Sequence, residues 1–307
     1  MRIGVDIGGS KIEVQALDEA GRVCLRRRQP TPHNGYNDAV GKLAGMILAA
    51  ESELGGTCSI GIGMPGAIDP RTGVLKNSHN TPFNDRPLKE DLERLLARRV
   101  RVENDANCLA LSEAIDGAAR GYRLSFSAVL GTGAGGGIVH AGRILPSANG
   151  LGGEWGHNPL PWMQPDEFPG PQCYCGRRGC IEQFVSGPAL SAAHAKAAGA
   201  TLEPAAIGAL ADAGDTAARA SLERYAQYLA RALAHVINLL DPEVIVLGGG
   251  LCNLRMLYRR VPELWKDFAY GGGSHTALVP ATHGDASGVR GAARLWDVNG
   301  GSAGRCI

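Results

Sequence analysis

The sequence predicts an α/β fold with largely parallel sheets, organised as two similar domains. Apolar runs typical of strands alternate with segments whose apolar residues recur every three or four positions, as on one face of a helix. The succession of strand, glycine-rich turn and strand occurs at residues 3–23 and returns at residues 127–144. Glycine supplies 44 of the 307 residues, about twice its usual share, and is gathered in a few turns rather than spread along a linker.

The individual elements follow from these apolar repeats. Helix ends are indicated by Gly55-Gly56 and by Asp241-Pro242, and Pro87 is favoured in the first turn of a helix. Strands are predicted at 2–7, 59–64, 126–131 and 243–248. The predicted helices contain Val40, Leu43, Ile47 and Leu54; Leu88, Leu92 and Leu95; and Leu222, Tyr225, Leu229, Leu233, Val236 and Leu240.

The repeat of the glycine hairpin places the main domain boundary near residues 118–124. We expect an N-terminal α/β lobe at 1–120 and a C-terminal α/β lobe at 121–287. A final helix at about 288–297 is expected to pack back on the first lobe. The polar, glycine-rich residues 298–307 are expected to form a disordered tail.

Composition excludes several classes of partner. Lys plus Arg number 31 and Asp plus Glu number 30, so no net field favours nucleic acid or an anionic membrane. No apolar run approaches the ~18 residues that span a bilayer. Asp6 interrupts the first apolar stretch, which is unlike a signal peptide. We therefore expect a cytoplasmic protein without nucleic-acid or membrane partners.

Three glycine turns are candidates for binding phosphate, because their backbone N–H groups can form a concave anion site. The first, "DIGGSK", adds a hydroxyl and a cation, and the second, "GTGAGGG", adds a threonine. The alternative is that these hairpins are structural. Asp6 is a candidate magnesium group or, alternatively, a residue that caps the turn. The candidate phosphate residues are Asp6, Gly8, Gly9, Ser10, Lys11, Thr132, Gly133, Gly248 and Gly249.

A short strand runs into a helix at "VRVENDANCLALSEA", with Asn104 and Asp105 at the junction. Ligands of open α/β sheets bind beyond the carboxyl ends of the strands. Asp105 is therefore a candidate base that accepts a proton from a substrate hydroxyl during phosphoryl transfer. The alternative is that these two residues only cap the helix.

Three cysteines, Cys173, Cys175 and Cys180, have the spacing C-x-C-x4-C, and His157 precedes them. Three thiolates and an imidazole suit a closed tetrahedral zinc site. A disulfide is the alternative, although the cytosol disfavours it, and chance clustering is another. Gly176 and Gly179 favour a tight knuckle around the metal.

The motifs together resemble the ROK family (repressor, open reading frame, kinase) of sugar kinases. They are "DIGGSK", "GIGMPG", "ENDAN", "GTGAGGG", "GEWGH", "CYCGRRGCIE" and "VLGGG", in that order along residues 1–297. The resemblance implies an actin-like, hexokinase-like (ribonuclease H-like) fold of two lobes, a homodimer, and ATP with Mg²⁺ and a hexose as ligands.

The resemblance also implies roles for individual residues. Asp105 would be the catalytic base for the sugar hydroxyl at C6, and Asn104 would bind a neighbouring hydroxyl. Glu154 would bind hydroxyls near C1 and C2, His157 would contact the sugar and ligate zinc, and Glu182 would be a further sugar contact. The structural zinc would hold the loop that carries these last residues.

Two further segments, "EWGHNPLPW" and "CLALSEAIDGAARG", resemble the fructokinase (manno(fructo)kinase) branch. We therefore expect an ATP:D-fructose 6-phosphotransferase that can also accept mannose, with N-acetylglucosamine kinase or glucokinase as alternatives. Transcriptional repressors of the family carry an N-terminal helix-turn-helix, whereas here the glycine turn begins near residue 6, so a repressor is not favoured.

Overall fold

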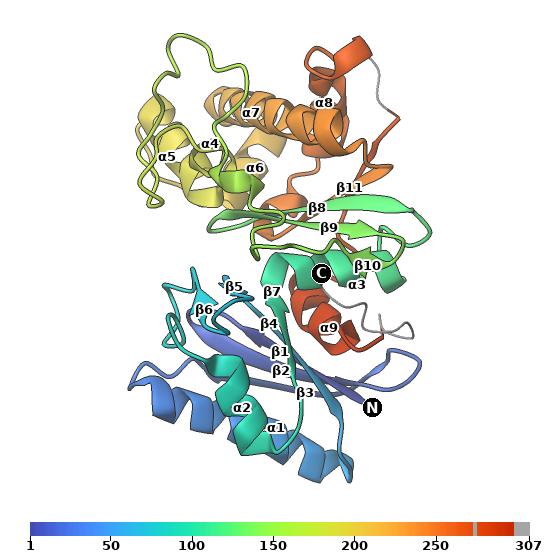
Figure 1. The fold of residues 1–307 in the computed structure, drawn as a ribbon. Helices are drawn as coiled ribbons and strands as arrows, with labels where there is room; N and C mark the ends of the chain where they lie inside the picture. The colour runs from blue at the N-terminus through green and yellow to red at the C-terminus, as the bar shows by residue number, and fades with distance from the viewer. Residues whose placement is uncertain (273–274, 298–307) are drawn as a thin grey trace. The chain divides into compact units, whose positions relative to one another are not determined.

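The structure is a computed structural model that describes residues 1–272 and 275–297. The predicted tail at 298–307 lies outside the described residues. The fold is mixed α/β, as the sequence predicts, and the chain divides into two compact units (Figure 1). Within the described residues, no helix combines the length and apolar character needed to cross a membrane.

The first unit consists of Met1–Asp116, Gly142–Gly152 and the segment from Asp285 onward, and the second of Gly117–Ala141 and Gly153–Gly284. The first boundary therefore lies close to the predicted one. The segment 142–152, which the sequence analysis placed in the second lobe, belongs to the first unit instead. Nothing in its local composition distinguishes it, because the assignment depends on contacts far away in the sequence.

The first unit contains a five-stranded sheet in the order β3-β2-β1-β4-β7. Strand β1 pairs antiparallel with β2 and parallel with β4, and β4 pairs parallel with β7. The carboxyl ends of β1, β4 and β7 therefore meet at one edge of the sheet. The strands are β1 (Arg2–Ile7), β2 (Lys11–Leu17), β3 (Val23–Pro30), β4 (Ser59–Met64) and β7 (Arg101–Asn104), with a small hairpin of β5 (Ala67–Ile68) and β6 (Leu75–Lys76); the helices are α1 (Tyr36–Leu54), α2 (Leu88–Leu96), α3 (Asp105–Asp116) and α9 (Ser287–Arg294).

The two faces of this sheet are covered differently, because side chains alternate along each strand. Ile3, Val5 and Ile7 of β1 are fully buried and pack in one core with the apolar face of α1. The opposite face presents glycine, and Gly4 of β1 pairs in register with Gly61 of β4. Helix α9 lies against this glycine surface (Figure 1).

The contact of α9 with the sheet requires glycine at position 61. A Cβ atom there would come within 1.9 Å of the Ala292 carbonyl oxygen, which belongs to the helix backbone and cannot rotate away. We expect Gly61→Ala to lower the free energy of unfolding by at least about 2 kcal/mol. Gly45→Ala, on the exposed side of α1 with nothing within 4 Å, should instead raise it by up to about 1 kcal/mol. Urea unfolding followed by circular dichroism tests the pair, and equal stability of both variants would contradict the packing.

The second unit contains β9, β8, β11 and β12 as neighbours in that order, with β8 and β9 antiparallel and β8, β11 and β12 parallel. Helix α7 ends at Asp241, as predicted, where the backbone turns left-handed. The strands are β8 (Leu124–Leu130), β9 (Ala134–His140), β11 (Val244–Gly248) and β12 (Ala277–Pro280), and β10 (Arg143–Ile144) follows where the chain returns to the first unit; the helices are α4 (Glu182–Val185), α5 (Gly187–Ala198), α6 (Pro204–Asp212), α7 (Thr216–Leu240) and α8 (Leu257–Trp265); the short 3-10 turns are η1 (Trp155–His157), η2 (Gly250–Asn253), η3 (Tyr270–Gly272) and η4 (Gly284–Ala286).

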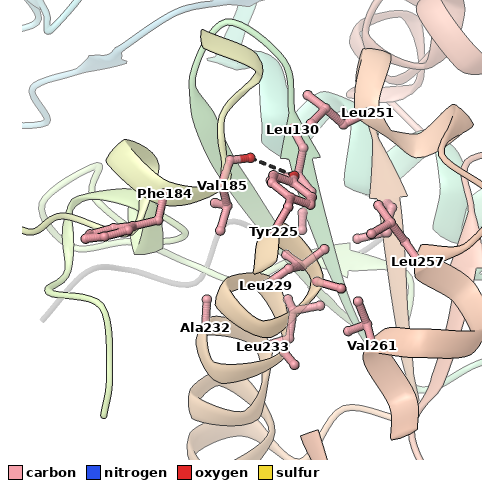
Figure 2. Close-up of a cluster of buried hydrophobic side chains, with 14 of the residues drawn as sticks. Leu130, Phe184, Val185, Tyr225, Leu229, Ala232, Leu233, Leu251, Leu257 and Val261 are labelled. Carbon is pink, nitrogen blue, oxygen red and sulfur yellow. Dashed lines mark hydrogen bonds between the residues drawn. The ribbon is translucent and has the colours of Figure 1, made fainter. Parts of the chain in front are cut away.

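The core of the second unit is built around α7. Tyr225, Leu229 and Leu233 point from this helix into a buried apolar cluster that also contains Val185 and Leu130 (Figure 2). The hydroxyl of Tyr225 donates a hydrogen bond of 2.8 Å to the carbonyl oxygen of Val185, so the buried phenol is satisfied. This bond fastens α4 to the core, and Glu182 is the first residue of α4.

Candidate active site

The junction of β7 and α3 holds two of the predicted site residues. The side-chain oxygen of Asn104 accepts hydrogen bonds from the N–H groups of Ala106 (2.9 Å) and Asn107 (3.4 Å), so Asn104 caps the helix. Its amide group also donates to the Gly66 carbonyl at 3.2 Å. Asn104 therefore does cap the helix, and it also lines a cavity described below, so capping does not exclude a binding role.

Two residues that the sequence analysis did not single out hold this junction in place. The Glu103 carboxylate accepts hydrogen bonds from the backbone N–H of Asn104 at 2.9 Å and from the side-chain amide of Asn107 at 3.0 Å. Both lie within the "ENDAN" motif, so a search for polar neighbours of Asp105 could have found them.

Asp6 and Asp105 lie at the same edge of the sheet, at the carboxyl ends of β1 and β7. Burial raises the pKa of Asp105, although hydrogen bonds from backbone N–H groups, chiefly that of Ala106, oppose the rise. Burial, together with the negative charges of Asp105 and Glu13, raises the pKa of Asp6 to about 7. Two carboxylates with raised pKa values suit a base and a cation-binding group, because a proton taken up from a substrate or a bound cation would offset the cost of their buried negative charge.

The raised pKa of Asp6 predicts a pH dependence of stability without nucleotide or divalent cations. The folded protein binds the proton more tightly than the unfolded chain, so stability falls as the pH rises from about 4 to about 7, by up to about 4 kcal/mol. Asp6→Asn should flatten this part of the profile, whereas Glu19→Gln, in an exposed turn, should leave it unchanged. Urea midpoints between pH 5 and pH 8 test this, and parallel profiles for all three proteins would contradict it.

The predicted turn at residues 8–11 connects β1 to β2. The Gly8 N–H donates to the Lys11 carbonyl at 2.9 Å, and Thr31 binds both sides of the turn through Gly8 and Ser10. A Cβ atom on Gly9 would come within 3.0 Å of the Asn80 carbonyl oxygen. The turn is therefore held tightly and needs a small residue at its tip.

A cavity of about 210 Å³ lies within the first unit beside Asn104. Glu103, Asn104 and Asn107 are among the residues that line it, together with Gly66 and Leu145. Its lining is slightly more polar than apolar, which suits a hydrophilic small molecule better than an apolar one.

In the second unit, Gly131, Thr132 and Gly133 form the short loop between β8 and β9. The loop is closed by a hydrogen bond of 3.0 Å from the Gly131 N–H to the Gly133 carbonyl, and the Gly131 carbonyl accepts a hydrogen bond of 2.8 Å from the Gly187 N–H. Thr132 is exposed at its tip. Gly249 has a left-handed backbone, and a Cβ atom there would come within 2.3 Å of the Leu130 carbonyl oxygen. The second and third predicted glycine turns, including Gly248 at the end of β11, are therefore neighbours.

Glu182 joins this glycine turn to the cysteine loop. One of its carboxylate oxygens accepts a hydrogen bond of 3.0 Å from the Ala134 N–H, directly after the turn, and a Cβ atom on Gly133 would come within 2.6 Å of the same oxygen. Glu182 is only 8% exposed, so this bond satisfies a buried charge. Sequence analysis missed the bond, because it joins residues 48 positions apart.

The predicted metal ligands do come together. One nitrogen or sulfur atom from each of His157, Cys173, Cys175 and Cys180 lies within 4.8 Å of the others. Cys175 Sγ lies 3.6 Å from Cys180 Sγ, which is too far for a disulfide, and Cys173 Sγ lies 3.6 Å from His157 Nδ1. Bond lengths of about 2.3 Å to sulfur imply S···S edges of about 3.8 Å in a tetrahedron. The four donors therefore fit a zinc ion.

The backbone explains why the loop can fold so tightly. Gly176 and Gly179 adopt left-handed φ angles of 87° and 73°, which other residues adopt at a cost. The Cys173 N–H donates to the Arg177 carbonyl at 2.8 Å, which closes the knuckle. Burial opposes ionisation of Cys175, but hydrogen bonds from Arg177 and the neighbouring thiols outweigh it and lower the pKa of Cys175. A thiolate is the form that binds metal.

Tyr174, between the first two cysteines, was not predicted as a site residue. Its hydroxyl lies 2.9 Å from His157 Nε2, and the two rings meet edge to face at 5.1 Å. Although the residue is 74% exposed, loss of hydration around the hydroxyl and the negative charges of Glu182 and Glu154 raise the pKa of Tyr174 to about 12. Glu154 itself is exposed and immediately precedes η1. Tyr174 therefore lies among the residues predicted to bind sugar.

The predicted residues thus form two groups. Within the first unit, the turn at 8–11 and the residues Asp6, Asn104 and Asp105 gather at one edge of the sheet. Within the second unit, the two glycine turns, Glu182 and the His157–cysteine cluster are linked by hydrogen bonds and close contacts. Their functional roles remain predictions.

Comparisons with known proteins agree with one another. The sequence profile of the ROK family matches residues 2–299. An N-acetyl-D-glucosamine kinase of Photobacterium profundum is 38% identical over 299 residues, covering 96% of this chain and 99% of that protein. A crystal structure of a ROK hexokinase from Thermus thermophilus is 35% identical, with a TM-score of 0.83, covering 95% of this chain and 96% of that one. A ROK family glucokinase from Streptomyces griseus, solved with glucose and AMPPNP, is 30% identical, with a TM-score of 0.78 and coverage of 96% and 98%.

Proposed function

Because the chain belongs to the ROK family, we propose that it is an ATP-dependent sugar kinase that phosphorylates the 6-hydroxyl group of a hexose. The observation that carries the proposal is Asp105, a carboxylate with a raised pKa at the carboxyl edge of the first sheet, beside the Asn104 amide. The relatives named as kinases, and the glucokinase solved with glucose and AMPPNP, support ATP and a sugar as the two substrates.

In the proposed reaction, Asp105 accepts the proton of the sugar 6-hydroxyl while that oxygen attacks the γ-phosphorus of ATP and ADP leaves. Mg²⁺ that arrives with ATP would neutralise the phosphate charge, and Asp6 would hold it or one of its waters. The turns at 8–11 and at 131–133 are each a candidate for binding phosphate oxygens through backbone N–H groups. Asn104 and Glu182 are each a candidate for a hydrogen bond to a sugar hydroxyl group.

We propose that His157 and the three cysteines bind one structural zinc ion. The donor set and the spacing of the donor atoms support this assignment. The ion would supply no step of the phosphoryl transfer; it would hold the loop between η1 and α4 in one conformation. His157 would reach the metal through Nδ1, the nitrogen that lies beside Cys173.

For the sugar itself, we propose N-acetyl-D-glucosamine, which is the substrate named for the relative that is 38% identical. The comparisons do not support the fructose expectation, although the "EWGHNPLPW" segment keeps fructose as the second candidate. An ADP-coupled assay should compare kcat/KM for N-acetylglucosamine, N-acetylmannosamine, glucose, mannose and fructose. We expect N-acetylglucosamine to give the highest value. A highest value for fructose would favour the second candidate, and no phosphorylation of any hexose would overturn the kinase proposal.

A further inference from the structure

Tyr174 is an aromatic residue whose position is fixed at both ends. Its backbone lies between Cys173 and Cys175, two of the candidate metal ligands, and its hydroxyl is 2.9 Å from Nε2 of His157. The residue is nevertheless 74% exposed, and within the part of the chain that the structure describes its one ring contact is with His157. An exposed aromatic side chain held in one place is a feature that packing alone does not explain, because the ring contributes little buried area.

The hydrogen bond with His157 has a defined direction. Nδ1 of His157 lies 3.6 Å from the Cys173 sulfur, so with the proposed zinc bound through Nδ1 the imidazole proton is on Nε2. Nε2–H therefore donates to the Tyr174 oxygen, which leaves the hydroxyl proton of Tyr174 free to donate elsewhere. The phenol can thus donate one hydrogen bond and accept one more. A sugar hydroxyl group can take part in either bond.

The surroundings of the hydroxyl match such a partner. The carboxylates of Glu182 and Glu154 act on the phenol electrostatically. Glu182 is proposed above to bind sugar hydroxyls, and the family resemblance implies the same role for Glu154. Glu182 already uses one oxygen for the Ala134 N–H, which leaves its other oxygen as the acceptor for sugar. Because His157 Nε2–H is engaged by Tyr174, the phenol hydroxyl, rather than the imidazole that was expected to contact the sugar, is the donor available beside these acceptors.

We propose that Tyr174 is a sugar-contacting, specificity-determining residue, which donates a hydrogen bond to a hydroxyl group at the C1 end of the hexose and packs its ring edge beside the sugar. The proposal rests on the proposed function, since it concerns the sugar that this kinase binds. It differs from a purely structural role, in which Tyr174 would only orient His157 toward the metal.

The test uses the full-length zinc-loaded protein and the matched variants Tyr174→Phe and Tyr270→Phe. Tyr270 is 94% exposed and also belongs to the second unit, so it controls for the loss of a phenol hydroxyl as such. Sugar binding is measured by calorimetry without ATP, and KM is measured for the sugar and for ATP. Tyr174→Phe should weaken sugar binding and raise the sugar KM by about 3- to 10-fold, with the KM for ATP unchanged. Tyr270→Phe should have no effect.

An analogue of the preferred hexose that lacks the C1 hydroxyl provides the second readout. The wild type and Tyr174→Phe should bind this analogue equally, since the partner of the phenol is gone. Release of zinc to a chelator provides a third readout and identifies the structural alternative. Faster zinc release by Tyr174→Phe with unchanged sugar affinity would overturn the proposal. If the wild type binds and phosphorylates no hexose, the proposed function fails together with it, whereas an active wild type with an equally active Tyr174→Phe overturns the inference alone.

Discussion

Asp105→Asn is expected to lower kcat by about a thousandfold or more, while the protein stays folded. Asparagine has nearly the same shape and can still accept the N–H bonds at the start of α3, but it cannot take up the proton of a sugar hydroxyl. Because burial disfavours the Asp105 charge, the neutral variant should be at least as stable as the wild type at pH 8. Steady-state kinetics with the preferred hexose and a thermal melt of the same samples measure both quantities.

Asp38→Asn is the matched control, since Asp38 is exposed in the first turn of α1. This variant should retain the wild-type rate. A variant of Asp105 that keeps a near-normal rate would remove this residue from the mechanism. If Asp105→Asn lost activity because it unfolds, the loss of activity would say nothing about proton transfer. The thermal melt shows whether the variant is folded.

The second large effect is expected from the metal. Cys175→Ser should reduce the zinc content from one ion per chain to almost none, lower the thermal midpoint by at least about 10 °C and weaken sugar binding. Cys175 is the best of the three sulfurs to change, because it is only half buried and its replacement removes little packing. Inductively coupled plasma mass spectrometry, a thermal melt and calorimetry give the three readouts.

Cys24→Ser, at an exposed cysteine in β3, should alter none of these quantities. Zinc chelation of the wild type should reproduce the effects of Cys175→Ser. A folded, active and tag-free wild type that contains no metal would disprove the zinc site, and the cysteine cluster would then need another explanation.

Much of the fold is visible in local sequence. The strand at 2–7 and the end of α7 at Asp241 were predicted at the residues where the structure has them, because both depend on apolar alternation or on a helix stop signal. The glycine surface under α9 was not foreseen as such. Gly4 and Gly61 are far apart in the sequence, and only strand pairing shows that they adjoin one another.

The candidate site divides in the same way. The motifs at 8–11, 104–105 and 173–182 allow chemistry to be predicted from short stretches, since the residue types and spacing of a glycine turn or a set of thiols are visible locally. The bonds from Glu182 to Ala134 and from Tyr174 to His157 connect different stretches, so they follow from the folded chain alone. The return of residues 142–152 to the first unit belongs to the same class of non-local facts.

The Glu182–Ala134 bond connects the cysteine loop to the glycine turn at 131–133, which is proposed to bind phosphate. An oxidant or chelator that removed the proposed zinc would loosen the start of α4 and, through the Glu182 carboxylate, the strand that follows the glycine turn. Oxidation of the thiols would then weaken the binding of both proposed substrates, and KM would rise for ATP as well as for the sugar.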